Sequence, residues 1–269
     1  GRYYLHQVDR DYALGRIPGG EVGERAEGDE APFTRQALWQ RAAEYYRQVR
    51  LPKASWKALD DLEAPLHEIE LLARAGDHDA AARVLNEIDF DYLLLWGHYR
   101  LLVGLYEGLL ERVQGQWLRG ACLNNLGRAY RNLGEVSKSI ACYQGALVID
   151  REIGDRRGEG TDLGSLGLAY ADLGQVEKAI EHYQQALVID REIGDRRGEG
   201  AWMGNLGLAY ADLGQVDKAI EHYQQALVIA REIGDRRGEG ADLGNLGAAY
   251  ADLGQVEKAI EHTQQQLDI

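Results

Sequence analysis

The chain has few cysteines and no long apolar segment, and both shortages limit the kind of protein it can be. Among 269 residues there are only two cysteines, Cys122 and Cys142. A secreted fold held together by disulfides needs more, so we expect two reduced thiols in a cytoplasmic protein. No run approaches the roughly 18–20 apolar residues that cross a bilayer. The most apolar segment, 92–97, is soon followed by Arg100, so a membrane is not an expected partner.

Basic charge and an amino-terminal leader are also missing. The formal net charge is −14, whereas nucleic-acid-binding proteins usually present a basic face, so nucleic acid is not an expected partner either. The first residues lack the basic and apolar regions of a secretory signal. They also lack a methionine, and we expect the chain to be a piece of a longer protein.

What the chain does contain is an internal repeat. The stretch EIGDRRGEG occurs unchanged at 152–160, 192–200 and 232–240, so its copies are evenly spaced. Segments 158–197 and 198–237 differ at only six positions, a more divergent copy lies at 118–157, and a truncated copy lies at 238–269. A fixed period of this length is the signature of a repeat architecture.

Each repeat is predicted to contain two helices. Apolar residues follow the spacing of one helix face over 162–174 and again over 175–194. Gly174 and Gly194 are expected to end these helices in the left-handed conformation. Asp155, Asp195 and Asp235 are expected to cap the next helix. The constant junction then sets the angle between neighbouring helix pairs, although recent duplication would also produce identical copies.

The repeats resemble the tetratricopeptide repeat (TPR). The TPR signature is, in order, a large residue, Leu-Gly, Tyr, Ala, an aromatic residue and Ala. The matching residues here are Leu163, Leu166, Gly167, Tyr170, Ala179, Tyr183 and Ala186, with equivalents in the preceding and the following repeat. The 40-residue period resembles the TPRs of kinesin light chains. The resemblance implies an all-α, right-handed α-solenoid with about four repeats in a regular array at 116–269, of which the last is truncated or atypical.

The region 1–115 is expected to be an irregular, TPR-like helical region. It should contain a flexible loop near 15–32, a helix at 34–50 capped by Thr34, a helix-turn-helix at 66–88 and one long helix at 92–113. Segments 3–14 and 56–100 resemble the part of bacterial STAND-type ATPases of the NB-ARC class that precedes a TPR array. This resemblance implies a sensor region whose partner, the nucleotide-binding part of the same protein, lies outside this chain.

The resemblance also implies a ligand site, because the first helices of a TPR array line its concave groove. Carrying the groove positions over predicts contacts from Asn124, Asn125, Arg128, Arg131, Asn132, Ser165, Leu168, Asp172, Asn205, Leu208, Asp212, Asn245 and Asp252. The asparagines at 125, 205 and 245 are expected either to hold an extended peptide backbone or to bridge neighbouring helices. Trp202 is interpreted as a ligand-specific aromatic contact or a core residue. Arg128 and Arg131 are expected to attract an acidic end of the ligand.

No catalytic or cofactor motif is apparent. The chain has no phosphate-binding loop, and its mid-helix glycines, Gly164 and Gly167, are interpreted as places where another backbone approaches closely. His182, His222 and His262 are expected at the surface rather than in a metal site. Asp162, Asp172 and Glu159 are interpreted as a solvated acidic face. We therefore expect no enzyme activity, no cofactor and no metal.

Two functions remain open. The first is a protein- or peptide-binding sensor of a STAND-type signalling ATPase, which passes ligand binding on to the nucleotide-binding part and can oligomerise on activation. The alternative is a structural, oligomerisation or autoinhibitory scaffold with no foreign ligand.

Overall fold

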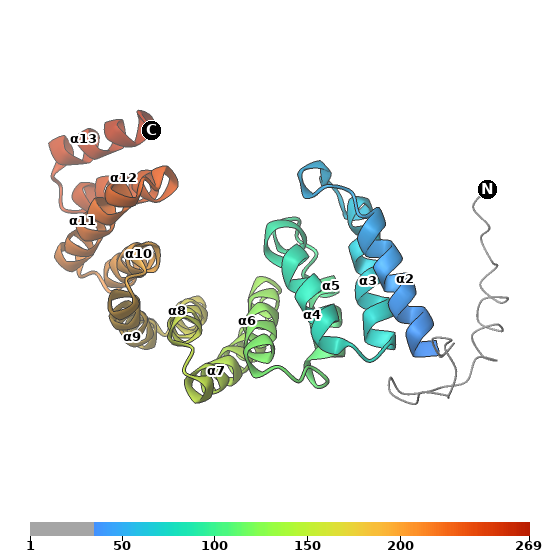
Figure 1. Cartoon of the computed structure of the whole chain (residues 1–269). Coiled ribbons are helices and arrows are strands. Elements are labelled where there is room, and N and C mark those ends of the chain that lie inside the picture. The colour runs from blue at the N-terminus through green and yellow to red at the C-terminus, as the bar shows by residue number, and fades with distance from the viewer. Residues whose placement is uncertain (1–34) are drawn as a thin grey trace. The chain divides into compact units, whose positions relative to one another are not determined.

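Residues 35–269 are described by a computed structural model and are helical throughout their regular structure (Figure 1). The elements over this range are α-helices, with short 3₁₀ and π-helical segments between some of them, and no strand is present among these residues. The all-α prediction is therefore confirmed. The expected loop near 15–32 and the Thr34 cap lie outside the described residues. The chain divides into two compact units between Leu118 and Arg119.

The described part of the first unit is a set of shorter helices. They are α2 (Arg35–Val49), α3 (Glu63–Arg74), α4 (His78–Ile88) and α5 (Tyr99–Leu110). Helix α2 packs on α3, and α3 packs on α4. The predicted helix-turn-helix is confirmed, because α3 ends before Gly76 and Asp77 caps α4 by accepting a hydrogen bond of 3.0 Å from the Ala80 backbone N–H.

The predicted single helix at 92–113 is wrong. A π-helical turn spans Asp89–Leu94, and α5 begins only at Tyr99. Between them Gly97 adopts φ +80°, the left-handed conformation that glycine tolerates. The His98 N–H then bonds to the Leu93 carbonyl at 2.8 Å, and the Gly97 N–H to the Leu94 carbonyl at 3.1 Å. This bonding pattern ends a helix even though the apolar residues continue past it.

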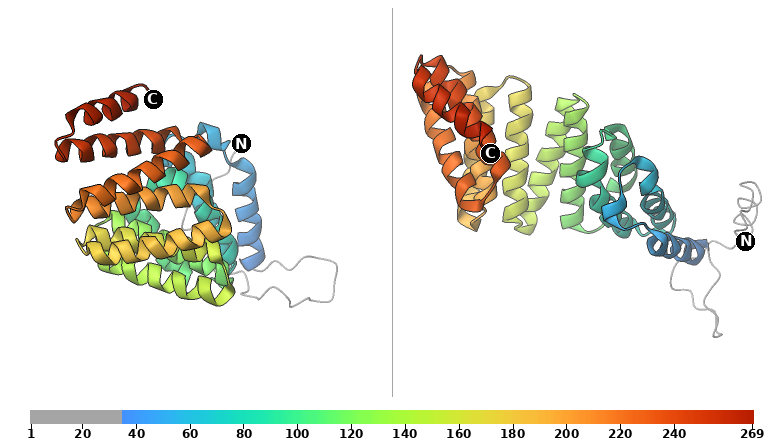
Figure 2. Two further views of the ribbon diagram at one scale, coloured as in Figure 1. Left: turned by 90° about the vertical axis from the view of Figure 1, so that its left-hand side faces the viewer. Right: turned by 90° about the horizontal axis from the view of Figure 1, so that it is seen from above.

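The second unit is an α-solenoid of helix pairs. It contains most of α6 (Gln116–Asn132), followed by α7 (Val136–Ile153), α8 (Arg156–Asp172), α9 (Val176–Ile193), α10 (Arg196–Asp212), α11 (Val216–Ile233), α12 (Arg236–Asp252) and α13 (Val256–Leu267). Figure 2 shows these helices stacked in chain order. Within the array α8 pairs with α9, α10 with α11 and α12 with α13, and each second helix also packs against the next first helix. No helix among residues 35–269 has the length and apolar character needed to cross a membrane.

In each regular helix pair, a glycine of the first helix packs closely against a tyrosine ring of the second helix. A Cβ added to Gly167 would stand 2.4 Å from the Tyr183 ring, and one added to Gly207 would stand 2.5 Å from the Tyr223 ring. The glycine of the Leu-Gly signature therefore makes room for the aromatic residue of the facing helix. In the last pair Thr263 replaces the tyrosine, and no residue of α13 is fully buried.

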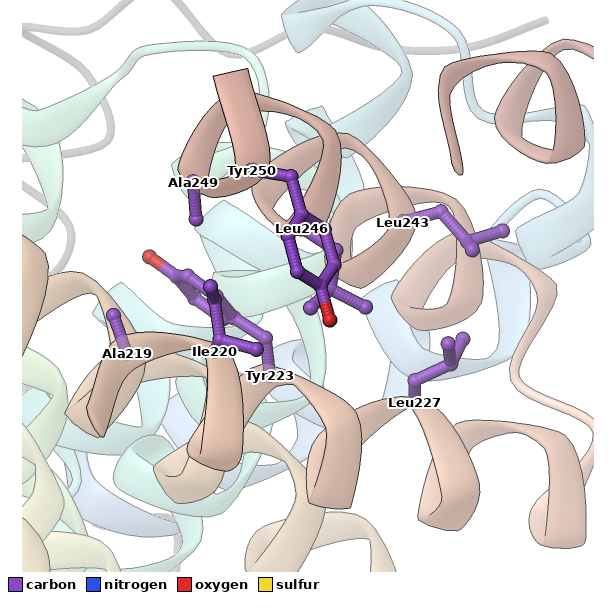
Figure 3. Close-up of a cluster of buried hydrophobic side chains, with 8 residues drawn as sticks. All are labelled: Ala219, Ile220, Tyr223, Leu227, Leu243, Leu246, Ala249 and Tyr250. Atoms are coloured by element: carbon purple, nitrogen blue, oxygen red, sulfur yellow. The ribbon is translucent and has the colours of Figure 1, made fainter. Parts of the chain in front are cut away.

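The apolar core between repeats continues from this glycine–tyrosine contact. In Figure 3 side chains of α11 and α12 face one another around the Tyr223 and Tyr250 rings. The cluster consists of Ala219, Ile220, Tyr223, Leu227, Leu243, Leu246, Ala249 and Tyr250. Burial of such side chains contributes about 1.5–3 kcal/mol for each large residue, so stacking of neighbours stabilises the array.

The unchanged EIGDRRGEG stretch forms the turn and cap between repeats, as predicted. Gly154 has φ +72° and ends α7, and its equivalents Gly194 and Gly234 do the same one and two repeats later. Asp155 caps α8 by accepting a hydrogen bond of 2.9 Å from the Gly158 N–H. Asp195 and Asp235 repeat this cap. Each cap stabilises its helix by about 1 kcal/mol.

The charged residues of the same stretch bond to one another. Glu159 accepts a hydrogen bond of 2.8 Å from Arg151 and is also paired with Arg156, which reaches on to Glu192 of the next repeat. Burial alone would raise the pKa of Glu159, but the two arginines hold that pKa below its usual value. The same ion pairs recur one repeat later. The glutamate and the first arginine of the RRGE segment are therefore paired in both of these copies.

Candidate functional site

Two cavities lie along the first helices of the array, where the groove was predicted. The smaller has a volume of about 220 Å³ and the larger of about 520 Å³. Half of the fourteen predicted groove residues line one or both of them: Arg131, Leu168, Asp172, Asn205, Leu208, Asp212 and Asn245. Asn205 and Leu208 border both cavities, so the two lie next to each other on α10. Leu208 is 46% exposed and offers an apolar contact to both cavities.

The smaller cavity contains an ion pair. Arg131 of α6 donates to Asp172 of α8 through two nitrogens, at 2.5 and 3.2 Å. Burial by itself would lower the pKa of Arg131, but the bonds to Asp172 raise it. Arg131 therefore already has an acidic partner in Asp172, and its attraction of an acidic ligand end stays a prediction.

The asparagine side chains differ in what they contact. Asn205 and Asn245 line the larger cavity, and within residues 35–269 neither amide is hydrogen-bonded to another side chain. Asn125 instead accepts a hydrogen bond from Arg128. Of the three asparagines predicted to hold a peptide backbone, two therefore have no side-chain hydrogen bond among the described residues. The role of these residues in binding stays a prediction.

The remaining groove candidates are less accessible or lie outside the cavities. Asn124 and Ser165 are buried. The exposed Asn132 donates a hydrogen bond of 2.8 Å to the Arg128 carbonyl. Asp252 is exposed but borders neither cavity.

Asp162 was expected to belong to a solvated acidic face, and this expectation is wrong. Asp162 is only 1% exposed and accepts a hydrogen bond of 2.6 Å from Asn124. Burial raises the pKa of Asp162, and the nearby Asp150 carboxyl group raises it further. The pKa of Asp150 is also raised by burial. Glu159 is likewise buried in its arginine pair rather than solvated.

Trp202 packs between repeats. Its indole Nε1 donates a hydrogen bond of 2.7 Å to Asp190 at the end of α9, and its ring lies against Gly164 and near the Tyr183 ring. Burial raises the pKa of Asp190 to about 6, although the Trp202 bond opposes the rise. The packing interpretation of Trp202 is supported by these contacts, and a direct ligand contact stays a prediction.

Asp242 holds the same place one repeat later but has different neighbours. It is 7% exposed and lines the larger cavity, together with Gly204 and Ala230. Burial raises its pKa to about 7, and nearby Asp235 adds to the rise. The sequence analysis did not include Asp242 in the site. The change from Asp190 to Ala230 was the signal that the surroundings of this position also differ.

The other sequence interpretations have mixed outcomes. Gly164 and Gly167 do allow a close approach, but the groups that approach are the rings of Trp202 and Tyr183 rather than a backbone. His182, His222 and His262 each lie against a tyrosine ring of the preceding helix. No group of three residues able to hold a metal ion occurs among residues 35–269.

Comparison with known families agrees with this geometry. The Tetratricopeptide repeat family matches residues 119–192 and 199–269, which is more than half of the chain. The chain therefore belongs to the tetratricopeptide repeat family. No curated protein sequence matches it.

Solved structures with a similar fold include BtubC (BKLC) from P. vanneervenii, with 22% identity, a TM-score of 0.61 and coverage of 87% of this chain and 88% of that one. A putative kinesin light chain from Podosopora anserina, with nearly identical TPR-like repeats, has 20% identity, a TM-score of 0.51 and coverage of 79% and 96%. A STAND protein with a tetratricopeptide repeat sensor from Pyrococcus horikoshii has 17% identity, a TM-score of 0.56 and coverage of 99% of this chain and 42% of that one. These likenesses show the fold alone.

Proposed function

We propose that the chain is a protein-binding module that holds an extended peptide segment in the groove formed by α8, α10 and α12. The observation that carries this proposal is the pair of neighbouring cavities, which are lined by half of the residues predicted for the groove. Asn205 and Asn245 contribute amides with no side-chain partner among the described residues, and Leu208 contributes apolar surface.

The chemistry of the groove fits a peptide backbone. An amide side chain both donates and accepts hydrogen bonds, so it can bond to the N–H and C=O of an extended chain without reading its side chains. Asn205 and Asn245 occupy the same position of successive repeats, on equivalent faces of α10 and α12, and line the same cavity. A peptide crossing the cavity would meet both.

We further assign the module to the sensor region of a STAND-type signalling ATPase that acts in the cytoplasm. The resemblance of segments 3–14 and 56–100 to such proteins supports this assignment, as does the similar fold of a STAND sensor. In this proposal ligand binding is passed on to a nucleotide-binding part elsewhere in the same protein. Both cysteines are thiols, which fits a reducing compartment.

A peptide selection tests the binding function. Random peptides displayed on phage would be selected on the chain, and the enriched sequences would be measured by calorimetry. We expect one peptide to bind per chain, with a Kd that changes only modestly between low and high salt, because amide and apolar contacts are not screened. If no peptide is enriched and light scattering shows a concentration-dependent oligomer, the scaffold alternative replaces this proposal.

A further inference from the structure

Three junctions of the array carry the same three positions with different residues. The first position is on one first helix, the second near the end of the following second helix, and the third on the next first helix. The three sets are Asn124, Asp150 and Asp162; Gly164, Asp190 and Trp202; and Gly204, Ala230 and Asp242. We call them the first, second and third junction sets.

The first two sets supply their own hydrogen-bond donor to a buried carboxyl group. In the first set the Asn124 amide donates to Asp162. In the second set the Trp202 indole donates to Asp190, and its ring fills the space over Gly164. A buried carboxylate is costly unless it is hydrogen-bonded, which explains why each set contains a donor.

The third set has the carboxyl group but not the donor. Within residues 35–269 no hydrogen bond reaches the Asp242 side chain, although this side chain is 7% exposed. The ring is missing as well. A Cβ added to Gly204 would meet only Asp242, at 3.4 Å, whereas one added to Gly164 would stand 2.1 Å from the Trp202 ring. The cavity of about 520 Å³ lies over Gly204 and Ala230, in the space equivalent to that of the Trp202 ring.

We propose that this cavity binds a tryptophan side chain of a protein partner, with the indole N–H donating to Asp242. The inference rests on the proposed peptide-binding function and names the side chain that the groove recognises. The ring would lie over Gly204 and Ala230, on a floor that includes Ile229 and Ile233. Trp202 shows, one repeat earlier, that an indole fits between two first helices of this array and bonds to a buried aspartate.

The size and polarity of the cavity agree with this occupant. Ligand pockets are typically about 300–1,000 Å³, mostly apolar, with a few polar groups that fix the orientation of the ligand. Tryptophan combines a large apolar surface with one N–H that needs a partner when buried. Arg197, Arg237 and Asp235 also line the cavity, so groups of both charge signs are available to the peptide.

The first experiment measures binding of free indole to the chain by ¹H–¹⁵N NMR, following the backbone amide of Gly204. We expect saturable shifts with a Kd of about 1 mM, typical of a fragment of this size. Benzofuran has the same shape with an oxygen in place of the N–H, and we expect it to bind roughly tenfold more weakly. Equal affinities for the two compounds, or no shift with indole, would overturn the proposal.

Two variants locate the site. The double variant A230D/D242W copies the second junction set into the third, so it fills the cavity with an arrangement that this array already accommodates. We expect it to fold and to lose indole binding. Asp242→Asn keeps the shape and removes the charge, and should weaken indole binding roughly tenfold without affecting benzofuran. Unchanged indole binding in both variants would overturn the proposal.

The peptide selection separates this inference from the proposed function. Enriched peptides that contain a tryptophan, and that lose binding to A230D/D242W, support both. Enriched peptides without tryptophan that bind equally to the wild type and to A230D/D242W overturn the inference and leave the peptide-binding function standing. If indole binds but no peptide is enriched, the peptide-binding function is overturned, and the preference of the cavity for an indole ring is supported.

Discussion

The ring of Trp202 lies on Gly164, so closely that a Cβ added to this glycine would stand 2.1 Å from the ring. Gly204 occupies the equivalent position one repeat later, and there an added Cβ would meet only Asp242, at 3.4 Å. The same residue type in the same repeat position therefore serves two purposes. One glycine accommodates an internal aromatic ring, and the other leaves a cavity open.

Substitution of these two glycines by alanine should have opposite effects on stability. Gly164→Ala forces the indole to move and should cost about 1–3 kcal/mol, as overpacking does. Gly204→Ala should instead gain about 0.5–1 kcal/mol, because alanine is the better helix former and the space is available. Thermal midpoints from circular dichroism would show this as a fall for Gly164→Ala and a rise for Gly204→Ala. Equal effects would contradict the packing assigned to Trp202.

Trp202→Phe should destabilise the array more at pH 8 than at pH 5. The variant removes the donor to Asp190, whose pKa is about 6. Above this pKa the buried carboxylate loses its partner, and we expect a cost of about 2 kcal/mol, including the smaller ring. Below it the carboxyl group is protonated and depends less on the donor. Urea unfolding at the two pH values measures the difference, and a cost independent of pH would argue against the bond.

Much of this architecture could be predicted from the sequence, because its signals are local. The regular period, the glycine turns and the aspartate caps each depend on patterns that can be read directly along the chain, and all were found. The π-helical turn before α5 was missed, since the apolar pattern continues through Gly97. The junction sets were also missed. Their members, such as Asn124 and Asp162, are far apart in the sequence and meet only when repeats stack.

The buried carboxyl groups should make the array less stable as the pH rises. Burial raises the pKa of Asp162 from the ordinary value of 3.8, so the folded state holds a proton that the unfolded chain releases. Stability from this group is therefore present at low pH and is lost as the pH rises through the raised pKa. Asp162→Asn mimics the protonated form. It should raise the thermal midpoint at pH 8 and reduce the fall between pH 5 and pH 8.

A matched control for this variant is Glu181→Gln, on the exposed face of α9. It removes one charge without touching a junction set, so the fall in thermal midpoint between pH 5 and pH 8 should match that of the wild type. If Asp162→Asn and Glu181→Gln give the same pH dependence, the raised pKa of Asp162 does not contribute.

Removal of the Asn205 and Asn245 side-chain amides should weaken ligand binding without destabilising the protein. For a selected peptide, the double variant Asn205→Ala/Asn245→Ala should lose at least about tenfold in affinity, since it removes hydrogen bonds worth about 1 kcal/mol each. The thermal midpoint should change little, because neither amide bonds to another side chain among the described residues. Gln225→Ala, on the exposed face of α11, is the control and should bind normally. Unfolding of the double variant would instead indicate that the asparagines are structural.

The most direct test of groove binding is to map where a selected peptide lies. A peptide carrying a photoreactive benzophenone would be cross-linked to the chain, and mass spectrometry would identify the attached residues. We predict attachment on the groove faces of α8, α10 and α12, at or beside Leu168, Asn205, Leu208 and Asn245. Attachment confined to α9, α11 or α13 would contradict the account.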